Sequence, residues 1–352
     1  MRSGCRGAAD RAVEGSHSFR HQNGRMTVLA PPDSRASGSS SPRPNRRRRV
    51  GLARVIALLG VAIVLLLALH TMVPDVAGIG LIVDTALPWF GLAVPVLLVG
   101  ALVVRSRAAI AASVLAALVW GVMFVPSIVP LSWTAVAASD ARLTVASQNV
   151  EAGSGTAADS ATALAGTGAD VLALQEMDAE SRAAVESVLD EVYPYSYGVG
   201  TVGVWSVFPI ENAQMLDLGL GWKRGLAADL ETPSGPVSIY VVHAASARPT
   251  GHDERDAMLV NLADHLDRDE NDRVIAVGDF NAGSSDRALV DITDQLSEAN
   301  QSDGGFGFTW PSAAPVVRLD HVFQRGMDVV SNTSVPAGAG DHLAVVATLN
   351  LE

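Results

Sequence analysis

Residues 274–282 read VIAVGDFNA, and this stretch decides the fold class of the chain. Its first four residues are apolar and mostly β-branched, which is typical of a buried strand. Gly278, Asp279 and Asn281 then end the apolar run with residue types that favour turns. Taken alone, this ending fits an ordinary turn. If the apolar run belongs to a sheet, the pattern predicts a buried strand whose last residues place polar side chains at the edge of that sheet.

Five further segments have the same organisation, an apolar run with polar residues at one end. With Arg273–Gly278, the predicted strands are Leu143–Val150, Asp170–Gln175, Val237–His243, Leu319–Phe323 and His342–Leu351. Single residues have simpler explanations, since Glu176 fits a helix cap and His243 fits a buried core histidine. Polar residues at several strand ends nevertheless gather along one sheet edge, which is where active sites form.

Helices are predicted at Ala158–Thr167, Ser181–Glu191 and Arg255–Leu266, where apolar residues recur at three- and four-residue spacing. Because strands and helices alternate from residue 142 onward, residues 142–352 are expected to form one α/β domain with mixed sheets. The segment contains no internal repeat.

The predicted strand ends carry carboxylates, imidazoles and amides: Glu176, Asp279, Asp341, His243, His342, Asn149 and Asn281. Carboxylates supply hard oxygen donors, which suit Mg²⁺, Mn²⁺ or Ca²⁺ better than zinc. Histidines titrate near neutral pH and donate hydrogen bonds to phosphate oxygens. Neutral amides hold a water or a phosphoryl oxygen without repelling it. This set predicts metal-assisted hydrolysis of a phosphoester.

The first 140 residues differ in composition from the rest. They hold 14 Arg and 6 acidic residues, a net charge of +8, whereas residues 141–352 carry −20. Residues 1–49 are predicted to form a disordered basic cytoplasmic tail, because they are polar and rich in Ser, Pro and Gly. Three uncharged apolar stretches follow, each long enough to cross about 30 Å of hydrocarbon. The predicted spans are about residues 55–74, 85–104 and 108–131, within an anchor at residues 50–134.

Charged residues beside these spans predict their orientation. Arg46–Arg49 precede the first span, and Arg105 and Arg107 lie between the second and third. The charged residues of the loop between the first and second spans are Asp75 and Asp84, with no lysine or arginine. The positive-inside rule therefore predicts a cytoplasmic N-terminus and an extracellular C-terminal domain. The spans themselves lack Asp, Glu, Lys and Arg, which favours a membrane anchor over a transporter.

The motifs, taken in order, resemble the endonuclease/exonuclease/phosphatase superfamily, which includes pancreatic-type deoxyribonuclease. They are SQNV (147–150), LQE (174–176), VVH (241–243), GDFNA (278–282), RLDHVF (318–323) and GDHLAV (340–345). The resemblance covers about residues 142–351 and implies a DNase I-like, four-layer α/β/β/α sandwich, preceded here by three transmembrane helices. It also implies a phosphoester hydrolase that uses Mg²⁺, Mn²⁺ or Ca²⁺, with water attacking in line.

The resemblance implies a metal site and a water site. Glu176 would be the principal metal ligand, supported by Asn149 and Asp341. Asp279 would orient or deprotonate the attacking water, and Asn281 would hold the scissile phosphate.

The resemblance also implies roles for two histidines. His243 and His342 would contact phosphate oxygens, with one of them assisting the leaving group, and Asp320 would fix the tautomer of His342. Two positions depart from the family pattern. Gly340 stands where serine is frequent, although the Asp-His pair after it is kept, and Val207 stands where arginine is frequent.

The sequence leaves alternatives open for the substrate and for the activity. The charge of −20 disfavours duplex nucleic acid, because DNA binding relies on Lys and Arg contacts to phosphates. The expected partners are the lipid bilayer and a small or membrane-borne phosphoester, while an extracellular metal-dependent nuclease stays open. A non-catalytic, membrane-tethered binding domain is a second alternative, although it predicts the loss of site residues that are all present.

A few further residues have two interpretations each. Lys223 and Arg224 fit either a phosphate contact or a solvated loop. Trp310 fits either a substrate surface or a packed core. His252 and Arg255 are expected to be structural.

Overall fold

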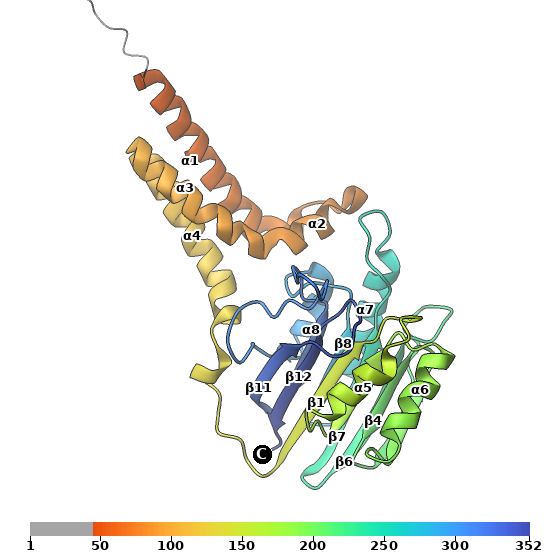
Figure 1. Cartoon of the computed structure of the whole chain (residues 1–352). Coiled ribbons are helices and arrows are strands. Elements are labelled where there is room, and N and C mark those ends of the chain that lie inside the picture. Colours follow the sequence, from red (N-terminus) through yellow and green to blue (C-terminus); the bar gives the residue numbers. More distant parts are fainter. Residues whose placement is uncertain (1–44) are drawn as a thin grey trace, which may run out of the picture. The chain divides into compact units, whose positions relative to one another are not determined.

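The computed structural model describes residues 45–352, so most of the predicted tail, residues 1–44, lies outside the described part. Two six-stranded sheets form the C-terminal domain (Figure 1). The first consists, in spatial order, of β11 (Asp328–Val335), β12 (Ala344–Asn350), β1 (Arg142–Asn149), β2 (Val171–Gln175), β4 (Val202–Ser206) and β3 (Tyr195–Val199). The second consists of β5 (Ile210–Met215), β6 (Gly225–Thr232), β7 (Gly235–His243), β8 (Val274–Asp279), β10 (Asp320–Arg325) and β9 (Ser297–Glu298). Both are mixed, since β1 and β2 pair in parallel, as do β7 and β8, while the other neighbours are antiparallel.

The two sheets pack face to face over an apolar core. Val145 and Val171 of the first sheet and Val241 and Val277 of the second are fully buried in it. Helices α5 (Ala157–Ala165) and α6 (Ala179–Leu189) pack on the outer face of the first sheet. Helices α7 (Asp253–Asp267) and α8 (Val290–Thr293) pack on the outer face of the second. These four layers confirm the predicted α/β/β/α sandwich.

All the strands and helices predicted for this domain are present, with ends that differ by a few residues. The sequence missed β3, β4, β5, β6, β9 and β11. Four of these, β3, β5, β9 and β11, are the edge strands of the two sheets. Edge strands are partly solvated and lack the continuous apolar runs on which the predictions relied.

Three helical segments precede the sandwich, and each is long and apolar enough to cross a membrane: Arg46–Met72, Val76–Val104 and Arg107–Ile128. Their α-helices are α1 (Asn45–Leu69), α2 (Ile79–Ala86), α3 (Phe90–Val104) and α4 (Arg107–Ile128). Short 3₁₀ turns lie at His70–Met72, Val76–Gly78, Leu87–Trp89, Leu131–Trp133 and Arg287–Leu289.

Two expectations for this segment were wrong. Arg46–Arg49 belong to helix α1 and not to a disordered tail, because arginine is a good helix former and the helix propagates past its apolar run. Asp84 lies in helix α2 and not in a loop, so the second apolar segment does contain a carboxylate. The side chain of Asp84 is buried, and its charge is compensated by Arg287, whose Nε donates to Oδ2 at 2.7 Å.

Candidate active site

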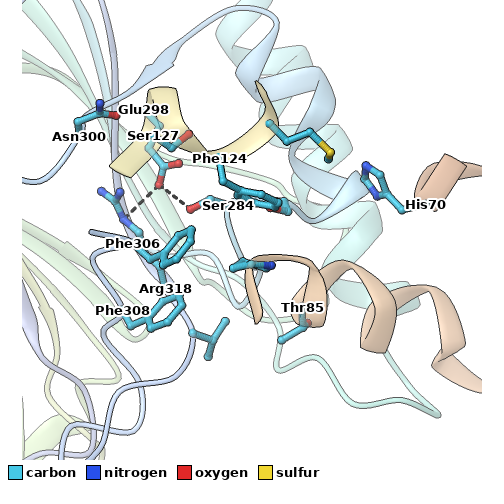
Figure 2. A pocket seen from close by; sticks show the side chains of 15 residues that line it. His70, Thr85, Phe124, Ser127, Ser284, Glu298, Asn300, Phe306, Phe308 and Arg318 are labelled. Carbon is cyan, nitrogen blue, oxygen red and sulfur yellow. Dashed lines mark hydrogen bonds and ion pairs between the residues drawn. The ribbon is translucent and has the colours of Figure 1, made fainter. Parts of the chain in front are cut away.

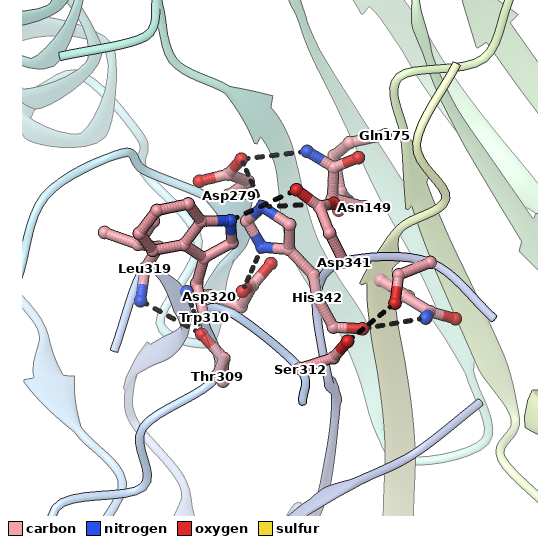
Figure 3. A network of polar contacts seen from close by, with 12 residues as sticks. Asn149, Gln175, Asp279, Thr309, Trp310, Ser312, Leu319, Asp320, Asp341 and His342 are labelled. Carbon is pink, nitrogen blue, oxygen red and sulfur yellow. Dashed lines mark hydrogen bonds and ion pairs between the residues drawn. The ribbon is translucent and has the colours of Figure 1, made fainter. Parts of the chain in front are cut away.

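The ends of several strands meet at one edge of the sandwich (Figure 3). In the first sheet, Asn149 of β1 stands opposite Gln175 of β2. In the second sheet, His243 of β7 and Asp320 of β10 both stand opposite Asp279 of β8. The register of the two sheets therefore brings together side chains that are far apart in the sequence.

Asp279 is buried at the centre of this edge. Its Oδ2 accepts a hydrogen bond from Asn149 Nδ2 at 3.0 Å, and its Oδ1 accepts one from the backbone N–H of Asn281 at 2.9 Å. Burial, followed by the negative charge of Asp320, raises the pKa of Asp279 in spite of the nearby histidines. A carboxylate with a raised pKa accepts a proton more readily than an ordinary one, which suits a general base.

His342 stands beside Asp279 and is held by Asp320 (Figure 3). Its Nδ1 lies 2.8 Å from Oδ2 of Asp320, and its Nε2 lies 3.9 Å from Oδ2 of Asp279. Burial alone would lower the pKa of His342, but the hydrogen bond and charge of Asp320, with the charges of Asp279 and Asp341, raise it to about 9. The imidazole is therefore a cation at neutral pH, which suits a contact to a phosphate oxygen.

Glu176 and His243 form a second pair, with Oε1 and Nε2 3.2 Å apart. The hydrogen bond from His243 is the largest of the effects on Glu176, and it lowers the pKa of that carboxyl to about 2 against partial burial. Glu176 is therefore ionised at neutral pH. Nδ1 of His243 is buried and has no hydrogen-bond partner within residues 45–352. Buried polar atoms without partners are rare in native proteins, and functional sites are one place where they occur.

Two site residues have an unusual backbone conformation. Glu176 and Asn281 adopt φ values of 59° and 47°. This left-handed conformation costs on the order of 1–3 kcal/mol for a residue with a side chain and is concentrated at functional sites. Arg255 stabilises the conformation of Asn281. Its Nη1 donates to the backbone oxygen of Asn281 at 2.9 Å and to Oδ2 of Asp286 at 2.7 Å.

The edge opens into a cleft of about 340 Å³. Five of the predicted site residues line it: Glu176, Asp279, Asn281, Asp341 and His342. The other three, Asn149, His243 and Asp320, are buried behind these and contact them. The fold thus brings all eight predicted residues to one place.

Two residues that have two interpretations each from the sequence lie at or beside the site: Trp310 in the wall of the cleft, and Arg224 next to His243. The Nε1 of Trp310 donates to Asp341 Oδ2 at 3.1 Å, and the indole lines the cleft, which supports the substrate-surface interpretation. Arg224 lies in the loop before β6 beside the exposed Lys223 but is half-buried, since its Nη1 donates to Ala244 O at 2.9 Å and lies 3.4 Å from Nε2 of His243. Neither residue is part of a periodic pattern, so the sequence left both interpretations open and only the tertiary contacts distinguish them.

The carboxylates of the cleft fit a divalent cation. Glu176 is ionised, and the side chain of Asp341 is 48% exposed, so both present oxygens to a hard ion such as Mg²⁺. Asp279, Asp320 and His342 form another group whose ligand atoms lie within 4.8 Å of one another, but all three are buried. In that group Nδ1 of His342 and Oδ2 of Asp320 are already bonded to each other at 2.8 Å, whereas Glu176 and Asp341 line the open cleft.

Comparison with known proteins gives a family match and fold matches. Residues 146–342 match the model of the Endonuclease/Exonuclease/phosphatase family. The structure is similar to truncated TDP2 from Caenorhabditis elegans, with a TM-score of 0.51 and 20% identity over 59% of this chain and 97% of that one. It is also similar to an endonuclease/exonuclease/phosphatase from Bacteroides vulgatus, with a TM-score of 0.52 and 17% identity over 60% and 99% of the two chains. No curated protein has a matching sequence.

At these identities the solved structures show the fold alone, a DNase I-like sandwich. The family match covers more than half of the chain and includes the whole candidate site, from β1 to His342. The chain therefore belongs to the endonuclease/exonuclease/phosphatase family.

Proposed function

We propose that this protein is a divalent-metal-dependent phosphoester hydrolase, a phosphodiesterase or phosphatase held in the membrane by three spans with its catalytic domain outside. Members of the family are generally hydrolases that act on phosphoesters and typically depend on a divalent metal. One observation carries the proposal: Asp279, the His342–Asp320 pair and the carboxylates of Glu176 and Asp341 surround a single cleft.

Glu176 and Asp341 would hold the metal ion, with Asn149 behind them. When bound, the ion acts as a Lewis acid on a phosphoryl oxygen and offsets the negative charge of the site.

The residues of the chain would divide the remaining work. Asp279 takes a proton from the attacking water, as its raised pKa favours. The new bond forms between the water oxygen and phosphorus, in line with the bond to the leaving oxygen that breaks. His342, a cation at neutral pH, donates a hydrogen bond to a phosphate oxygen, and Asn281, which lines the cleft, holds the phosphoryl group. His243 is buried behind the cleft and acts through Glu176, since its Nε2 lies 3.2 Å from Oε1 of Glu176.

Substrate and orientation rest on charge. The −20 of residues 141–352 argues against duplex nucleic acid, so a nuclease is the weaker candidate. The presence of every predicted site residue around the cleft argues against a non-catalytic binding domain. The arginines at the start of α1 and at Arg105 and Arg107 support a cytoplasmic N-terminus and an extracellular C-terminal domain.

The test uses the full chain purified in detergent, with Mg²⁺, Mn²⁺ or Ca²⁺. Substrates are bis-p-nitrophenyl phosphate, duplex DNA, sphingomyelin and inositol phosphates. We expect metal-dependent turnover that is abolished in Asp279→Asn. If the folded wild-type protein hydrolyses none of these substrates, the assignment as an enzyme is refuted. Full activity in Asp279→Asn would refute the assignment of the site. For orientation, a tag after Glu352 should be digested by external protease on intact cells, and protection of the tag would refute the proposed sidedness.

A further inference from the structure

Helix α2 of the membrane segment forms part of the wall of the catalytic cleft. Leu81 and Thr85 line the cleft together with Asp279. Asp84, on the same helix, accepts hydrogen bonds from Arg287 of the catalytic domain, from Nε at 2.7 Å and from the backbone N–H at 3.1 Å. Because Asp84 is buried, this contact fixes the helix against the catalytic domain.

A second cavity, of about 240 Å³, adjoins the cleft (Figure 2). The two share Thr85, Gly283 and Val317 in their walls. The rings of Phe306 and Phe308 line this aromatic cavity and are stacked, with centroids 5.3 Å apart. The aromatic cavity therefore begins where the catalytic cleft ends.

An open groove between α1 and α4 continues from the aromatic cavity. The two share His70 and Met123. Leu67, Leu118 and Val122 also line the groove, and the exposed fractions of Leu118 and Val122 are 61% and 78%. On a helix that crosses a membrane, such apolar side chains face the lipid. The aromatic cavity thus shares one wall with the cleft and another with the groove. Together the three form a continuous path from the catalytic residues to the lipid-facing surface of the helices.

The aromatic cavity suits an apolar occupant. Phe124 packs edge-on against Phe306, with ring centroids 5.9 Å apart, and extends the apolar wall. The charged groups of Glu298 and Arg318 in the cavity wall are already paired, since Glu298 accepts a hydrogen bond from Ser284 Oγ at 3.1 Å and lies 3.1 Å from Nε of Arg318 (Figure 2). Burying hydrocarbon against such a wall is favourable, whereas a polar occupant would compete with an existing ion pair.

We propose that the substrate is an amphiphilic phosphoester, whose phosphate lies in the catalytic cleft and whose hydrocarbon chain passes through the aromatic cavity into the groove between α1 and α4. This inference rests on the proposed hydrolase function and names its substrate class. It assigns the membrane helices a second role, because they supply the chain-binding wall as well as the anchor. The aromatic cavity alone would also suit a nucleobase, but the residues that line the groove beyond it include no lysine or arginine to receive further phosphates, and its one histidine, His70, is paired with Asp84 at 2.9 Å.

The test compares substrates that release p-nitrophenolate and differ only in their second ester group: bis-p-nitrophenyl phosphate, p-nitrophenyl octyl phosphate and p-nitrophenyl hexadecyl phosphate. The full chain is assayed in lipid nanodiscs with Mg²⁺. Met123→Trp places a larger ring where the aromatic cavity meets the groove. Val125→Trp is the matched control, since Val125 lies on the same helix, is 45% exposed, and lines neither the cavity nor the groove. Met123→Phe adds less volume and serves if the tryptophan variant does not fold.

In the wild type, kcat/KM should rise with chain length by up to about fourfold per buried methylene, or roughly 0.8 kcal/mol. Met123→Trp should reduce kcat/KM for the hexadecyl ester at least tenfold relative to bis-p-nitrophenyl phosphate, and Val125→Trp should keep the wild-type ratio. Chain length also changes partition of the substrate into the bilayer, so the ratio between these two variants is decisive. An equal ratio in both would overturn the inference while leaving the hydrolase intact. Absence of turnover of all three esters by the wild type would instead refute the proposed function.

Discussion

Oδ2 of Asp84, in helix α2, lies 2.7 Å from Nε of Arg287, which follows the end of β8 at Asp279 by eight residues. Arg287 also donates to the backbone oxygens of Val73 at 2.7 Å and His70 at 2.8 Å. One arginine of the two-sheet domain thus binds both the buried carboxylate of α2 and the end of the first apolar segment.

Loss of this ion pair should destabilise the protein. Asp84→Ala removes the partner of Arg287 and leaves a partly buried cation, so we expect a loss of about 1–3 kcal/mol, below the value for a fully buried pair because Arg287 is partly exposed. Thermal unfolding of the full chain in detergent measures the change. Asp264→Ala is the control, because Asp264 and Arg268 are exposed and 3.6 Å apart, and it should change stability by less than about 0.5 kcal/mol.

Asp320 should act through His342. In Asp320→Asn the imidazole loses its carboxylate partner at Nδ1, so its orientation and its positive charge are no longer maintained. We expect kcat on bis-p-nitrophenyl phosphate to fall by about 10²- to 10⁴-fold, with KM changing far less. Asp328→Asn, an exposed aspartate at the start of β11, should retain wild-type kinetics. A loss below tenfold in Asp320→Asn would contradict the assigned role.

Glu298 should make stability depend on acid pH. Burial opposes its ionisation, but the charges of Arg318 and His321 outweigh this and lower its pKa from 4.5 to about 2. Because the folded-state pKa is the lower one, the stabilisation is complete above about pH 4.5 and is lost as the pH falls towards 2. Glu298→Gln should therefore destabilise the protein at pH 7, and the difference from wild type should shrink below pH 4.5. Glu231→Gln, at an exposed position, should show no such dependence.

Activity should require a divalent metal that Glu176 helps to hold. A chelator should abolish hydrolysis, and added Mg²⁺ or Mn²⁺ should restore it. Glu176→Gln removes an anionic oxygen donor, so the metal concentration for half-maximal activity should rise by at least about tenfold. Glu180→Gln, exposed on α6, is the matched control and should need no more metal than the wild type. An unchanged metal requirement in Glu176→Gln would exclude this residue as a ligand.

The sequence alone identified six of the eight central strands, because each keeps an apolar run whose ending is marked by turn-forming residues such as Gly278 and Asn281. The two central strands that it missed, β4 and β6, have their apolar runs interrupted at Gly203 and Asp229. It also missed the edge strands β3, β5, β9 and β11, which are partly exposed to solvent and therefore lack a continuous apolar run. It also identified the apolar segments, since crossing a bilayer sets a minimum length that can be counted. The sequence could not predict that Asp84 lies within a helix, because its buried charge is compensated by tertiary contacts, with Arg287, 203 residues away, and with His70.

For the candidate site too, the sequence predicted one part and the tertiary structure decided the rest. Residue types and their order along the chain determined which side chains form the site, since carboxylates, amides and imidazoles have fixed chemistry wherever they lie. Their electrostatic state, such as the raised pKa of His342 and the lowered pKa of Glu176, follows from burial and from partners that only the tertiary structure brings into contact. The same holds for Leu81, which the sequence placed in the loop before the second span, and for Thr85, the first residue of that span, because only the packing of α2 places them in the wall of the cleft. Local patterns encode apolar periodicity and turns, whereas contacts across hundreds of residues depend on how the folded sheets and helices pack.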